Sequence, residues 1–76
     1  MNTTLTDSNN DNWDVTYISE ENSVKEFKCV RGEDIMTLYL NQDGSMYGVE
    51  YFFIQLSHDE NLKQLNTQIF NWYSSL

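Results

Sequence analysis

The residue types that could do chemistry in this chain are a short acidic segment, one histidine, one cysteine and three pairs of adjacent carboxylates. Asp7, Asn9 and Asp11 have the alternate spacing of the first three ligands of a calcium loop. The calcium pattern then fails, because Asn12 stands where glycine is needed and Ile18 stands where a bidentate glutamate is needed. The sequence therefore predicts no metal site.

His58 and Cys29 are the candidates for proton transfer and for nucleophilic attack. A general base needs an orienting partner and a pocket, and the helix-capping segment around His58 explains that residue without either. Lys28 precedes Cys29, but consecutive strand residues point to opposite faces, so this lysine is not placed to stabilise a thiolate. We expect a buried, unreactive cysteine, no catalytic residue and no cofactor.

Composition indicates a small acidic domain, since the 76 residues include twelve acidic and four basic side chains and give a net charge of −8. A chain of this length buries only about 60% of its unfolded surface, so its core is thin. A single cysteine cannot form an intrachain disulfide, and no segment has the roughly 20 apolar residues of a membrane span. Residues 1–11 also lack the apolar region of a signal peptide. We expect a soluble cytoplasmic protein.

Alternating apolar and polar residues predict four strands, at residues 12–18, 24–31, 35–40 and 46–56. Turn signals separate them at Ser19–Asn22, at Gly32 and at Asn41–Ser45, the last containing an Asp-Gly pair. Residues 1–11 contain only Leu5 as a sizeable apolar anchor, so we expect a disordered or frayed tail. The single folded domain is expected to comprise residues 12–76.

A helix is predicted from His58 to about Ser74, because Ser57 and Glu60 have the spacing of a capping box. Apolar residues follow at three- and four-residue intervals: Leu62, Leu65, Ile69, Trp72 and Leu76. The predicted fold class is α+β, a four-stranded antiparallel β-meander (β-β-β-β-α) with one C-terminal amphipathic helix packed on one face.

A meander sorts the carboxylates to the two ends of the sheet, because successive turns alternate between these ends. One end is expected to carry Glu20, Glu21 and Asp43, and the other Asp11, Asp14, Glu33, Asp34, Asp59 and Glu60. Adjacent carboxylates at exposed turns are not expected to have the perturbed pKa of an acid–base pair. Concentrated negative charge repels nucleic acid and anionic membranes and favours a protein partner with a basic surface. The alternative is that the charge only maintains solubility.

Aromatic residues offer a second contribution to binding, because one helix can cover only one face of the sheet. Some of these rings are expected on the far face or at the helix edge: Trp13, Tyr17, Tyr39, Tyr47, Tyr51 and Phe53. Tyrosine and tryptophan are enriched at interaction hot spots, although the rings could also pack with one another and with the tail. The predicted partner-binding residues are Asp14, Glu20, Glu21, Glu33, Asp34, Asp43, Asp59, Glu60, Tyr47, Tyr51 and Phe53.

The chain contains no alanine or proline and is rich in Asn, Tyr, Ile and Phe, which is typical of coding sequence rich in A and T. In size, acidity and this bias it resembles small antagonists encoded by phages and plasmids, among them anti-CRISPR proteins and DNA mimics. The resemblance implies a non-enzymatic inhibitor in the host cytoplasm that blocks a basic nuclease, polymerase or other nucleic-acid-handling protein. Two alternatives stay open, a homodimeric structural or accessory subunit and a toxin-neutralising immunity protein.

Overall fold

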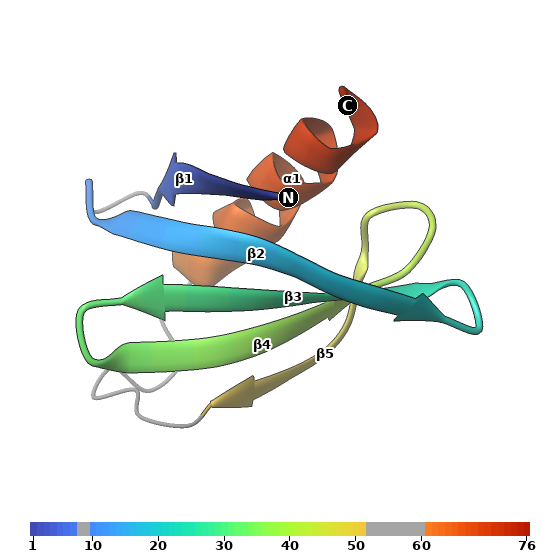
Figure 1. The fold of residues 1–76 in the computed structure, drawn as a ribbon, viewed down its shortest axis with the longest axis horizontal. Helices are drawn as coiled ribbons and strands as arrows, with labels where there is room; N and C mark the ends of the chain where they lie inside the picture. Colours follow the sequence, from blue (N-terminus) through green and yellow to red (C-terminus); the bar gives the residue numbers. More distant parts are fainter. Residues whose placement is uncertain (8–9, 52–60) are drawn as a thin grey trace.

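The computed structural model describes residues 1–7, 10–51 and 61–76, which form a five-stranded antiparallel sheet and one helix (Figure 1). The elements are β1 (Asn2–Thr6), β2 (Asn12–Glu21), β3 (Val24–Arg31), β4 (Asp34–Leu40), β5 (Met46–Tyr51) and α1 (Asn61–Ser74). Each strand pairs with the next one along the chain, in the order β1-β2-β3-β4-β5. The α+β class and the antiparallel sheet are confirmed, but the sheet has five strands where four were expected.

The additional strand, β1, lies in the segment that was expected to be a frayed tail. It pairs antiparallel with β2, and Leu5 lies opposite Trp13 on the face that carries the core. The helix also holds this strand, since Gln68 Nε2 donates a hydrogen bond of 2.7 Å to the Thr6 carbonyl oxygen. The small number of apolar residues in this segment did not predict β1, because backbone pairing with β2 and polar contacts stabilise the strand in addition to the burial of Leu5.

Strand β2 is longer than predicted and includes Ser19–Glu21, which we expected to form a turn. The reversal occurs instead at Asn22 and Ser23, whose φ angles of 52° and 66° are those of a type I′ hairpin turn. A bulge between Tyr17 and Ser19 precedes this end, and Glu20 pairs across the strands with Lys25. A polar strand end is tolerated here because it extends beyond the core into solvent.

Strand β5 is described only to Tyr51, so the predicted continuation to Leu56 lies outside the described residues. The predicted capping box at Ser57 and Glu60 also lies outside them. The described helix ends at Ser74, as predicted.

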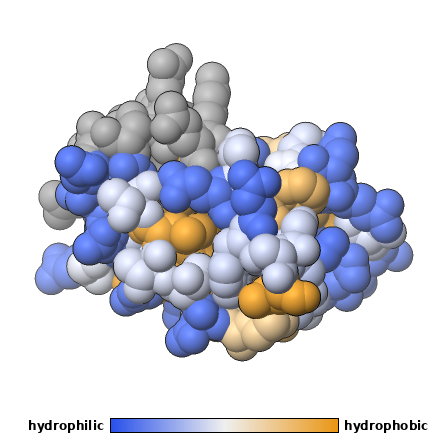
Figure 2. Space-filling model, turned by 90° about the horizontal axis from the view of Figure 1, so that it is seen from above, coloured by the Kyte–Doolittle hydropathy of each residue, from blue (hydrophilic) through white to orange (hydrophobic). Residues whose placement is uncertain are grey.

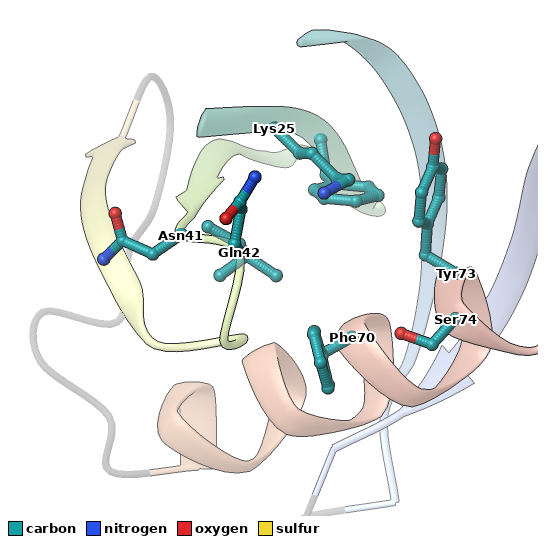
Figure 3. Close-up of a pocket in the computed structure, with 8 residues that line it drawn as sticks. Lys25, Asn41, Gln42, Phe70, Tyr73 and Ser74 are labelled. Atoms are coloured by element: carbon teal, nitrogen blue, oxygen red, sulfur yellow. The ribbon is translucent and has the colours of Figure 1, made fainter. Parts of the chain in front are cut away.

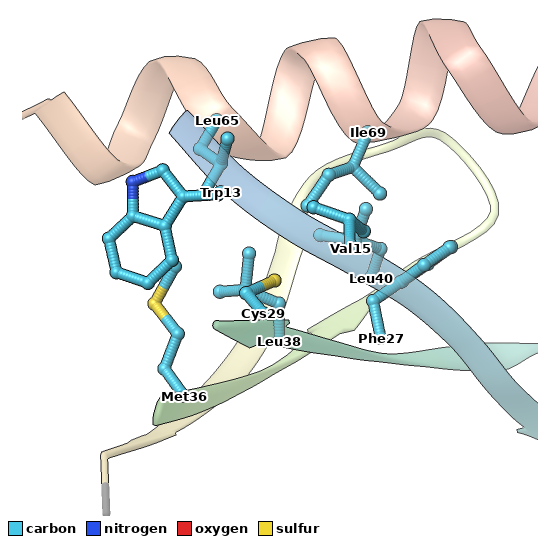
Figure 4. Close-up of a cluster of buried hydrophobic side chains, with 9 residues drawn as sticks. All are labelled: Trp13, Val15, Phe27, Cys29, Met36, Leu38, Leu40, Leu65 and Ile69. Carbon is cyan, nitrogen blue, oxygen red and sulfur yellow. The ribbon is translucent and has the colours of Figure 1, made fainter. Parts of the chain in front are cut away.

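The core lies between α1 and one face of the sheet, here called the inner face (Figure 4). Nine side chains are fully buried there: Trp13, Val15, Phe27, Cys29, Met36, Leu38, Leu40, Leu65 and Ile69. The alternation predicted for β2, β3 and β4 is therefore confirmed, because the inward members of each strand are these residues. The opposite side of the sheet is here called the outer face, and within residues 1–7, 10–51 and 61–76 no helix lies on it.

Gly44 brings the β4–β5 loop close to the helix. Its φ is +87°, and a Cβ at this position would lie 2.6 Å from Cγ of Phe70. Asn66 Nδ2 donates a hydrogen bond of 3.2 Å to the Gly44 carbonyl oxygen and fixes the loop against α1. Only glycine can make this approach without displacing the ring.

The Gly44→Ala substitution is expected to lower the free energy of unfolding by about 2–4 kcal/mol, from the positive φ and the clash with Phe70 together. Gly32→Ala is the matched control, because Gly32 also has a positive φ, +58°, but nothing lies within 4 Å of a Cβ there. The control is expected to cost only about 1–2 kcal/mol. Urea denaturation measures both, and equal losses would show that contact with Phe70 does not constrain the loop.

Candidate functional site

Arg31 gathers three carboxylates at the end of the sheet formed by the β1–β2 loop and the Gly32 turn. Its Nη1 lies 3.1 Å from Asp7 Oδ2 and 3.2 Å from Asp11 Oδ2. Its Nε and Nη2 donate to Asp34 Oδ2 at 3.2 and 3.0 Å across the turn. We call Asp7, Asp11, Arg31 and Asp34, together with Trp13 beneath them, the arginine cluster.

Asp7 is the buried member of the arginine cluster, with 1% of its side chain exposed. Its Oδ1 accepts a hydrogen bond of 3.1 Å from the Asp11 amide, and its Oδ2 accepts one of 2.9 Å from Trp13 Nε1. Arg31 Cζ lies 4.5 Å from the centroid of the Trp13 ring, a cation–π contact. Asp7 and Asp11, the two aspartates with calcium-loop spacing, therefore stabilise the hairpin loop between β1 and β2. Asp34, which was predicted to bind a partner, forms its ion pair with Arg31 of the same chain.

The opposite end of the sheet carries Glu20 and Asp43, and both also have local partners. Glu20 Oε1 lies 3.3 Å from Lys25 Nζ. Asp43 Oδ1 accepts hydrogen bonds from the Ser45 hydroxyl at 2.6 Å and the Ser45 amide at 2.9 Å, which hold the pKa of Asp43 below its usual value. These contacts shape a hairpin and a loop, so their first role is structural.

Six carboxylates form no ion pair among the described side chains. They are Asp14, Glu21, Glu26, Glu33, Asp43 and Glu50. Four of them belong to the outer face of the sheet: Asp14, Glu21, Glu26 and Glu50. Asp14 lies there beside Thr4, whose hydroxyl donates to it at 3.2 Å, and Glu26 and Glu50 pair across the strands with Tyr39 and Thr37.

Tyr39 is the centre of this outer-face group. Partial burial raises the pKa of Tyr39, and the carboxylates of Glu50 and Glu26 raise it further, Glu50 also through a hydrogen bond. Glu26 and Glu50 therefore lie on either side of one phenol. A hollow of about 220 Å³ adjoins the ring, and its lining includes Glu21, Glu26 and Tyr47. We call Glu21, Glu26, Tyr39, Tyr47 and Glu50 the tyrosine patch.

The tyrosine patch contains two of the predicted partner-binding residues, Glu21 and Tyr47. The β4–β5 pairing has a register shift, in which Met46 pairs with Leu40 and Gly48 pairs with Tyr39. Tyr47 lies between them without a partner in the register, and 69% of the residue is exposed. Tyr51 is exposed as well, but it pairs with Met36 and therefore belongs to the inner-face side.

The other predicted partner-binding residues do not join this patch. Glu33 is exposed at the Gly32 turn, far along the sheet from Tyr47. Phe53, Asp59 and Glu60 lie outside the described residues. Glu26, Tyr39 and Glu50 were not predicted to bind a partner. The signal was present in the sequence, because each of them is adjacent to an inward-facing residue, Phe27, Leu38 or Val49, and must therefore point to the outer face.

Hydrophilic residues dominate the side of the molecule that carries β1 and α1, where hydrophobic areas are small and separated (Figure 2). No helix in the described part of the chain is long and apolar enough to cross a membrane. Within the same residues, no group of three or more His, Cys, Asp and Glu side chains could hold a metal ion. Comparison with protein families, curated proteins and solved structures finds no match to this chain.

Replacing Asp7 by asparagine tests the arginine cluster. Asparagine removes the charge that accepts bonds from Arg31 and Trp13 in a buried position, so Asp7→Asn is expected to lower the free energy of unfolding by about 2–3 kcal/mol. Asp11 contacts the same guanidinium nitrogen but is half exposed, so Asp11→Asn is expected to cost less than about 1 kcal/mol. Thermal and urea unfolding measure both, and the reverse ranking would contradict this account of the cluster.

Cys29 is fully buried, and burial raises the pKa of its thiol to about 12. The native protein is therefore expected to react with iodoacetamide at least about a hundredfold more slowly than the urea-unfolded chain at mildly alkaline pH. Mass spectrometry over time measures both rates. Fast alkylation of the native protein would show that the thiol is accessible and would revive a nucleophilic role for it.

Proposed function

We propose that this protein is a small, non-enzymatic inhibitor that binds the basic surface of a nucleic-acid-handling protein, such as a nuclease or a polymerase. The outer face of the sheet is the proposed contact surface, with the tyrosine patch at its centre. The observation that carries the proposal is the group of carboxylates around Tyr39, which form no ion pair among the described side chains.

The charge of the outer face supports a basic partner, because two of the described cationic side chains form ion pairs away from this face. Arg31 is bonded to the arginine cluster and Lys25 to Glu20, so the described cation left on the outer face is Lys28, which faces Thr16 and Thr37. The four carboxylates on that face, of Asp14, Glu21, Glu26 and Glu50, exceed it in charge. Such a surface attracts a positively charged partner and increases the rate of encounter, and salt weakens both effects.

Aromatic contacts support affinity in addition to charge. Tyr47 is largely exposed, and Tyr39, Tyr47, Glu21 and Glu26 line the same hollow. A lysine or arginine side chain of a partner would meet cation–π and ion-pair contacts in the same place. The pairing of β3, β4 and β5 holds this arrangement before binding, which lowers the entropy cost of association.

In this proposal the protein is encoded by a phage or another mobile element and acts in the cytoplasm of the host. Its mode is that of an anti-CRISPR protein or a DNA mimic, in which side-chain carboxylates occupy a surface that normally binds phosphates. The size, acidity and compositional bias of the chain support this assignment. A toxin as the basic partner would make the same surface that of an immunity protein.

Association with a panel of purified nucleases and polymerases, measured by surface plasmon resonance across a salt series, tests the proposal. For a partner found in this way, the double substitution Glu26→Gln and Glu50→Gln is expected to slow association roughly tenfold. Glu20→Gln with Glu33→Gln is the matched control, because it removes the same charge away from the outer face, and it is expected to have a much smaller effect.

Three outcomes would count against the proposal. They are binding that ignores ionic strength, equal effects of the two double variants, and no binding to any basic protein in the panel. A melting temperature that rises with protein concentration would instead favour the homodimeric accessory subunit.

A further inference from the structure

A pocket of about 410 Å³ lies at the inner face, where the C-terminal half of α1 passes the loop between β4 and β5 (Figure 3). This volume falls within the roughly 300–1,000 Å³ of small-molecule sites. Apolar and polar side chains share its walls: Phe27, Leu40, Phe70 and Tyr73 are the apolar ones, and Lys25, Asn41, Gln42 and Ser74 are the polar ones. Aromatic walls combined with a small number of polar groups are the usual form of a ligand site.

The walls of this pocket are held in place by contacts outside it. Gly44 abuts the Phe70 ring, and Asn66 bonds the Gly44 carbonyl oxygen. Within the loop, the Asn41 amide donates to the Ser45 carbonyl oxygen at 2.9 Å, and the Gly44 amide donates to the Asn41 carbonyl oxygen at 3.0 Å. Tyr73 is fixed from behind by Tyr17 and Phe27, whose ring centroids lie 4.8 and 5.7 Å from its own. These contacts hold the loop and the Tyr73 ring on either side of the pocket.

Lys25 gives the pocket a positive charge. Its Nζ lies 5.5 Å from the centroid of the Tyr73 ring, and its side chain is only 21% exposed. The carboxylate beside it belongs to Glu20, which is 41% exposed, and surface ion pairs of this kind contribute only about 0–1 kcal/mol. An anion entering the pocket can therefore share Lys25 with Glu20 or displace that side chain toward solvent.

We propose that this pocket binds a small aromatic monocarboxylate. The ring system of the ligand lies against the half-buried rings of Phe70 and Tyr73, above a floor formed by the buried Phe27 and Leu40, where apolar burial and ring contacts stabilise it. The carboxylate accepts from Lys25 Nζ and from the amide of Gln42. A single charge fits this chain better than several, because a net charge of −8 repels more highly charged anions. The pocket lies on the opposite side of the sheet from the tyrosine patch, so this binding does not depend on the proposed partner surface.

Titration of the isotope-labelled protein with naphthoate, followed by amide NMR shifts, tests this site. Naphthoate is expected to shift the signals of the β4–β5 loop and the last turns of α1 in a saturable way. Naphthalenemethanol, a neutral analogue of similar size, is expected to bind at least about tenfold more weakly, because it cannot pair with Lys25.

Three substitutions separate the role of Lys25 from general electrostatics. Lys25→Met is expected to weaken naphthoate binding about tenfold, whereas Lys25→Arg keeps the charge and retains it. Lys28→Met removes the same charge from the outer face and is expected to leave binding unchanged. The proposal is overturned if naphthoate gives no saturable shifts at the pocket, if the alcohol binds as tightly, or if Lys28→Met weakens binding as much as Lys25→Met.

Discussion

The contact on which the rest of the structure depends is that of one guanidinium with three carboxylates. In a chain with a net charge of −8, Asp7, Asp11 and Asp34 would repel one another at the same end of the sheet. Arg31 converts this repulsion into a connection between the β1–β2 loop and the β3–β4 turn. Because Asp7 also bonds Trp13, the same contact fixes a large core side chain and aligns β1 beside β2. The fifth strand and the end of the core thus share one electrostatic support.

Local pattern predicted the centre of the sheet correctly, and long-range contacts decided its edges. Met36, Leu38 and Leu40 alternate with polar or half-exposed residues, so period two alone assigns their face. In contrast, β1 contains one apolar residue between threonines and asparagine, and its order depends on pairing with β2 and on the bonds of Asp7. No pattern within residues 1–11 contains that information, because Arg31 lies 24 residues from Asp7 in sequence.

The candidate site was predictable only in part for the same reason. The predicted meander correctly placed successive turns at alternate ends of the sheet. A carboxylate at one end, however, can be neutralised by a cation that is distant in sequence, and the strand pattern does not reveal this. Asp34 bonds Arg31, while Glu26, which was not selected, has no ion-pair partner among the described side chains. The grouping of Glu26, Tyr39 and Glu50 follows from strand register, and the shift near Tyr47 adds an exposed ring that simple alternation would have placed with Val49. Register is a property of pairs of strands, so a single strand's sequence does not reveal it.

The separation of roles between the two faces supports a binding function for the outer one. Among the described residues, every fully buried apolar side chain belongs to the inner face or to α1, so the outer-face carboxylates are not part of this core. Like charges on one face destabilise a small domain, and their retention is not required by packing, capping or an internal ion pair. Solubility alone would be served equally well by mixed charges spread over the surface. A cluster of negative charge around a tyrosine, held in place by strand pairing, is the arrangement expected where a cationic partner supplies counter-charge.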